Sequence, residues 1–80
     1  MMNAAIWEGD ALVVDKAIDP THGSIIVASL KGEFTVKRLH KKQGEVYLMP
    51  ENSAFKLIKI TEESDFQVFG VVTYIIHKAR

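Results

Sequence analysis

Short apolar segments separated by tight turn signals run through most of this 80-residue chain. Clear signals of this kind are Asp19-Pro20, Lys31-Gly32 and Gln43-Gly44. β-Branched and aromatic residues are frequent between them, and no segment keeps a helical period for more than a turn or two. Several short strands joined by turns are typical of a barrel or a sandwich-like sheet, so the sequence predicts a mostly-β fold.

The expected strands cover Ala11–Ile18, Ser24–Leu30, Glu33–Lys41, Glu45–Pro50, Phe55–Ile60 and a long closing segment that begins at Phe66. The two-residue link Lys31-Gly32 predicts a hairpin between the strands on either side of it. Gly70 interrupts the closing segment, where it indicates a bulge or a bend. In Phe55–Ile60 two alternating sets of apolar residues compete for the core face, and the sequence leaves that choice open.

Length and composition narrow the classes of protein further. Eighty residues with 48% hydrophobic content suit one small domain over residues 1–80. Lys and Arg total 10, as do Asp and Glu, so the formal net charge is zero. We therefore expect no direct nucleic-acid site and no electrostatic binding to an anionic membrane. The absence of cysteine excludes disulfides and fits a cytoplasmic protein. The first residues lack the pattern of a signal peptide, so we expect none, and the 80 residues contain no apolar run of about 18 residues.

The motifs of common metal and cofactor sites are absent from the sequence. His22, His40 and His77 have no second ligand at metal-like spacing, so we expect neither a metal nor another cofactor. No serine lies in a G-x-S-x-G turn, and the glycines form no phosphate-binding cluster. The small basic patch of Arg38 and His40–Lys42 is interpreted as a solvated strand end.

Lys37 stands in the middle of an otherwise apolar strand. Strand alternation places it on one face with Thr35 and Leu39, while Phe34 and Val36 belong to the other face. A lysine on a half-exposed face needs no special explanation. In an apolar site, however, a neutral lysine amine can take a proton from a serine hydroxyl. The residues alone leave both interpretations open.

Several segments, in order along the chain, resemble the self-cleaving peptidase domain of the LexA and UmuD family. The central one is "GEFTVKRL" (Gly32–Leu39), preceded by "HGSIIVASL" and followed by "LMPENSAF". "EGDALVVDKAI" (Glu8–Ile18) resembles the family's early strand, and "VFGVVTYII" (Val68–Ile76) its closing strand. The similarity runs from Met1 to Arg80 and is nearer to the UmuD type than to the LexA type.

The resemblance implies a fold of strongly bent β-sheets, here truncated at its N-terminal side. It also implies a serine nucleophile and a lysine general base, and the family's "TVK" strand assigns the base to Lys37. The family's nucleophile lies in a Ser-Met pair whose methionine aligns with Met1. The serine is therefore expected immediately before Met1, outside these 80 residues, together with the arm that carries the cleavage site. These 80 residues by themselves are accordingly expected to be inactive.

By resemblance, the whole protein would belong to SOS mutagenesis after DNA damage. A RecA filament on single-stranded DNA would stimulate its self-cleavage, and the trimmed homodimer would serve as an accessory subunit of an error-prone translesion DNA polymerase. One alternative is the C-terminal dimerisation and self-cleavage domain of a LexA-like repressor. Another, of a different class, is a non-catalytic small β-barrel that binds proteins.

Overall fold

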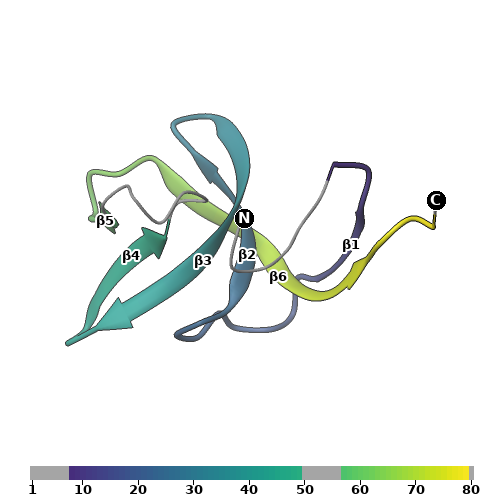
Figure 1. Ribbon diagram of the computed structural model, residues 1–80. Helices are drawn as coiled ribbons and strands as arrows, with labels where there is room; N and C mark the ends of the chain where they lie inside the picture. The colour runs from purple at the N-terminus through teal and green to yellow at the C-terminus, as the bar shows by residue number, and fades with distance from the viewer. Residues whose placement is uncertain (1–7, 50–56, 80) are drawn as a thin grey trace.

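Six antiparallel strands form one sheet in the computed structural model, which describes residues 8–49 and 57–79 (Figure 1). The strands are β1 (Ala11–Asp15), β2 (Ile25–Leu30), β3 (Glu33–Lys42), β4 (Glu45–Met49), β5 (Ile58–Ile60) and β6 (Phe66–Ile76). Their order across the sheet is β1-β6-β2-β3-β4-β5. No helix occurs in the described ranges, so none there is long and apolar enough to cross a membrane. The predicted mostly-β, strongly bent fold is confirmed, and these strands form an open sheet with β1 and β5 at its edges.

Two tight hairpins join β2, β3 and β4. Leu30 pairs with Glu33 across the first turn, and both Lys31 and Gly32 have positive φ, at 53° and 81°. The second turn repeats this geometry, with Gln43 at 52° and Gly44 at 78°. Two central residues with positive φ define a type I′ turn, whose twist matches that of the flanking strands. The hairpin predicted from the Lys31-Gly32 link is confirmed.

The long strand β6 lies between β1 and β2 and bends where its pairing is irregular. Val27 pairs with Gly70 but Ala28 pairs with Val68, so Phe69 is the extra residue of a bulge. A Cβ atom on Gly70 would lie only 2.5 Å from Cγ1 of Val14. Glycine is therefore required here by the close approach of β1, and the irregularity predicted at Gly70 is present.

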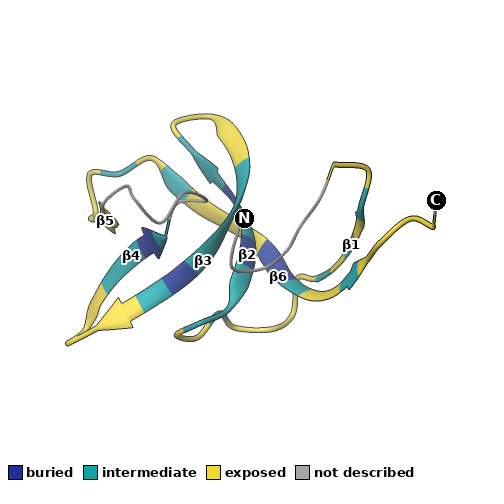
Figure 2. Ribbon diagram, in the orientation of Figure 1, coloured by how far each residue is buried: buried dark blue, intermediate teal, exposed yellow. Residues whose placement is uncertain are grey.

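The core lies on one face of the bent sheet, over its central strands (Figure 2). Its buried members are Ile26, Ala28, Leu39, Leu48 and Val71. The pairing of β4 with β5 places Ile58 opposite Leu48 and Ile60 opposite Val46. Directly opposed residues share a face, so Ile58 and Ile60 take the core side of this segment. Phe55, from the competing set, lies outside the described residues.

Candidate functional site

Lys37 lies on the same face of the sheet as the hydrophobic core. It pairs directly with the fully buried Ile26 of β2, and Leu39, two residues along β3, is 3% exposed. Lys37 itself is half-buried. The predicted sharing of one face by Lys37 and Leu39 is confirmed. The face turns out to be the apolar one, which makes a lysine there less ordinary than the sequence alone indicated.

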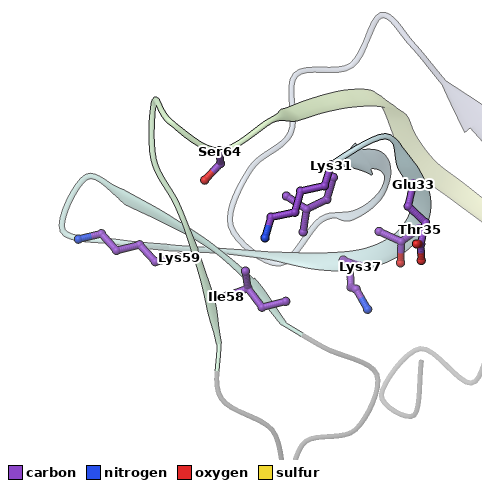
Figure 3. A pocket seen from close by; sticks show the side chains of 8 residues that line it. Lys31, Glu33, Thr35, Lys37, Ile58, Lys59 and Ser64 are labelled. Carbon is purple, nitrogen blue, oxygen red and sulfur yellow. The ribbon is translucent and has the colours of Figure 1, made fainter.

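A pocket of about 520 Å³ adjoins Lys37 at the closed end of the β2–β3 hairpin. Its described lining residues come from that hairpin, from β5 and from the turn before β6: Leu30, Lys31, Glu33, Thr35, Lys37, Ile58, Lys59 and Ser64. Figure 3 shows Glu33, Thr35 and Lys37 following one another along β3, with Ile58 and Lys59 on β5 across the pocket. The pocket therefore combines apolar walls with several ammonium groups.

The ammonium group of Lys37 makes no hydrogen bond or ion pair with any residue that the structure describes. A carboxylate partner would hold the amine in its charged form, in which it cannot accept a proton. Lys37 is half-buried beside the core face and has no such partner among the described residues. The arrangement can therefore support general-base chemistry at Lys37.

Ser64 is the serine among the described residues lining this pocket, and its hydroxyl has a local structural role. Its Oγ accepts a hydrogen bond from the backbone N–H of Thr61 at 3.0 Å, and its own N–H donates to the Thr61 carbonyl at 3.0 Å. These bonds close the turn that leads into β6. In Figure 3 the Ser64 and Lys37 side chains do not point toward each other. The serine predicted before Met1 lies outside the described residues.

The basic patch of Arg38 and His40–Lys42 holds the loop that precedes β2 against β3. Nη1 of Arg38 donates to the carbonyl of Gly23 at 2.8 Å, and Nζ of Lys41 donates to the carbonyl of Pro20 at 3.3 Å. Nδ1 of His22 accepts the backbone N–H of Lys41 at 3.0 Å, and the His22 and His40 rings meet edge-on, 4.8 Å apart. These contacts give the patch a structural role.

The third histidine links the start of β1 to the end of β6. Nδ1 of His77, just after β6, lies 2.8 Å from Oδ2 of Asp10, just before β1. The Asp10 side chain is only 3% exposed, and no sequence pattern pointed to this pair. No group of three or more potential metal ligands occurs in residues 8–49 and 57–79.

Sequence reasoning also missed the polar contacts at the β4–β5 edge. Nζ of Lys59 lies 2.6 Å from a carboxylate oxygen of Glu45, and the Tyr47 hydroxyl donates to the other oxygen at 3.1 Å. The hydrogen bond from Lys59, and after it the one from Tyr47, lowers the pKa of Glu45 below its ordinary value. The same bond raises the pKa of Lys59. Only the pairing of β5 with β4 brings Lys59 to Glu45, so no local pattern could have shown this ion pair.

Beside the pocket, one half of β3 has a backbone edge that pairs with no strand among the described residues. The backbone N–H of Leu39 donates to the carbonyl of Ser24, and the Leu39 carbonyl accepts the N–H of Gly23, so both groups point toward the β2 side. Because these directions alternate along a strand, Phe34 and Val36 point their N–H and C=O groups the other way. Strand β4 pairs with β3 only from Arg38 onward, so no described strand pairs with the outward-pointing groups of Phe34 and Val36.

Comparison with known proteins places the chain in a family. Residues 1–73 match the model for the Peptidase S24-like family. Protein SamA of Salmonella typhimurium is 45% identical over 80 residues, 100% of this chain and 54% of its own length. Protein ImpA of Shigella flexneri is 41% identical over the same span, also 54% of its length. The LexA repressor of Bordetella parapertussis is 41% identical over 76 residues, 35% of its length.

The chain thus spans about half the length of SamA and ImpA and about a third of the LexA repressor. Its all-β sheet, the order of its motifs and the family match agree with one another. The chain belongs to the Peptidase S24-like family, in the LexA/UmuD group that its motifs resemble.

Proposed function

We propose that this chain is part of a UmuD-like self-cleaving serine peptidase domain in which Lys37 is the general base. The observation that carries the proposal is the position of Lys37: half-buried on the core face of β3, at the wall of a pocket, with no ion-pair partner among the described residues. Its place in "GEFTVKRL" agrees with the base of the family's dyad. The nucleophile is proposed to be a serine immediately before Met1.

In the proposed reaction, the seryl oxygen attacks a peptide carbonyl while Lys37 takes the hydroxyl proton. Backbone N–H groups would stabilise the oxyanion. Lys37 would then deliver the proton to the leaving amine, which breaks the C–N bond and leaves an acyl-serine. A water molecule, deprotonated by the same lysine, would hydrolyse this ester and restore the serine.

The substrate is proposed to be the protein's own N-terminal arm or that of a partner subunit. The edge at Phe34 and Val36, where no described strand pairs, supports a peptide substrate, because an extended segment can add to such an edge through main-chain hydrogen bonds. A segment bound there would run directly beside the Lys37 side chain, since β3 supplies both features.

For the whole protein we propose a role in SOS mutagenesis. Self-cleavage would be stimulated by a RecA filament, and the processed homodimer would act as an accessory subunit of an error-prone translesion polymerase. The similarity to SamA and ImpA over the full 80 residues supports this assignment. The 41% identity to a LexA repressor favours a second candidate, the self-cleavage domain of a repressor. An upstream helix-turn-helix region would select the repressor, and a short arm would select the UmuD-like protein.

The experiment is to express the full-length protein and follow its self-cleavage by mass spectrometry as a function of pH. The rate should rise with pH, since only the unprotonated amine can accept the proton. Lys37→Ala should remove most of the rate, and Lys37→Arg should fail as well, because guanidinium stays protonated in proteins. Lys42→Ala, an exposed change on the same strand, serves as the control and should cleave normally. Cleavage by Lys37→Arg at the parental rate would overturn the assignment.

A further inference from the structure

Three lysines and one glutamate are among the described residues that line the pocket beside Lys37: Lys31, Lys37, Lys59 and Glu33. Lys59 is already paired with Glu45 at 2.6 Å. The side chain of Lys31, like that of Lys37, makes no hydrogen bond or ion pair with a described residue. Lys31 therefore brings to the pocket an ammonium group that is not engaged by any described residue.

Lys31 also occupies a backbone position that disfavours lysine. Its φ of 53° places it in the left-handed region, which glycine and asparagine adopt more easily. Its N–H donates to the Asp65 carbonyl at 2.7 Å, which fixes the hairpin turn against the turn before β6. The side chain extends from this fixed turn across the pocket in Figure 3. A strained residue held in place beside a candidate site is a reason to ask what its side chain binds.

We propose that Lys31 is a specificity-determining residue, an inference that rests on the proposed function. Its ammonium group would bind an acidic side chain of the peptide segment to be cut. The apolar Leu30 and Ile58 in the same pocket can contact the methylene groups of a glutamate or aspartate, while the Lys31 ammonium pairs with its carboxylate. Lys37, lying further along β3, stays available for proton transfer. The ligand is thus an acidic peptide segment near the scissile bond.

The test compares self-cleavage rates of the full-length protein and its charge variants. Lys31→Gln should slow cleavage about two- to fivefold, the range expected for an exposed ion pair, and Lys31→Glu about tenfold because repulsion is added. Gln43→Glu is the matched control, since Gln43 has the same place in the second type I′ turn but does not line the pocket. It should change the rate less than twofold. High salt should slow the parent and leave Lys31→Gln almost unchanged.

A charge swap makes the test decisive. Each acidic residue of the upstream arm is changed to lysine in turn, and the self-cleavage rate is measured. At least one of these variants should cleave slowly by itself and faster when it is combined with Lys31→Glu. Failure of every such pair, or a rate for Lys31→Glu within twofold of the parent, would overturn the role of Lys31. If Lys37→Ala is still inactive in that case, the proposed peptidase function stands by itself. If Lys37→Ala cleaves normally, the proposed function has failed instead.

Discussion

The close approach of β1 to Gly70 gives a quantitative prediction about stability. In Gly70→Ala the new Cβ would meet Cγ1 of Val14 at 2.5 Å and the Asp15 carbonyl oxygen at 3.1 Å. The first distance is well inside van der Waals contact and the second is tight, so β1 or β6 must shift. Overpacking of this kind costs about 1–3 kcal/mol of the free energy of unfolding. We therefore expect Gly70→Ala to lose stability in that range.

The assay is urea unfolding of the full-length protein, combined with a double-mutant cycle. Val14→Ala removes the atom that clashes, so the pair Val14→Ala with Gly70→Ala should be more stable than the sum of the two single effects by about 1 kcal/mol. The Asp15 contact belongs to the backbone and remains, so the rescue is partial.

Gly44→Ala is the control for this cycle, because it adds a Cβ where nothing lies within 4 Å but φ is +78°. It should cost about 1 kcal/mol from backbone strain alone and add independently to Val14→Ala. Strict additivity of Val14→Ala and Gly70→Ala would refute the steric explanation, as would a Gly70→Ala protein as stable as its parent.

Three further predictions concern activity, association and titration. The 80-residue chain alone should not cut an arm-containing relative during long incubation; a specific cut seen by mass spectrometry and lost in Lys37→Ala would contradict the proposed dyad. Light scattering should show a homodimer that uses β6 at tens of micromolar, an ordinary range of affinity, whereas a monomer there would count against it. Lys59→Ala should raise the pKa of Glu45 back toward 4.5 in an NMR titration. Because that pKa is lowered in the folded protein, the stabilisation by the pair is present above the unfolded pKa and lost as pH falls through the lowered one.

Local patterns predicted the strands and turns well. Both X-Gly turns and the irregularity at Gly70 depend on glycine, which tolerates positive φ and close backbone approach where other residues do not. The face of Lys37 followed from strand alternation. Strand ends were less well predicted: β1 stops at Asp15, three residues before the expected end. There the side chain of Asp15 accepts the N–H of Ala17 at 2.8 Å, a local turn that competes with the strand.

The pocket could not be predicted from the sequence, because its walls come from segments far apart in the chain. Lys31 belongs to the first hairpin turn, while Ile58 and Lys59 belong to an edge strand placed by its pairing with β4. The ambiguity of Phe55–Ile60 had to be settled before Ile58 could be assigned to this site. The Asp10–His77 pair likewise depends on the meeting of the first and last strands.

The pairing of β1 with β6 has a consequence for synthesis of the protein. In the meander of β2, β3 and β4, each strand pairs with the strand next to it in the sequence. These pairings can form once Met49 has left the ribosome. Strand β1 can pair only after β6 has been synthesised, because Ala11 pairs with Ile76, close to the C-terminal end of the 80 residues. The proposed nucleophile precedes β1 and the proposed base lies in the meander. A growing chain would therefore keep the two apart, and cutting could begin only after β6 has been made.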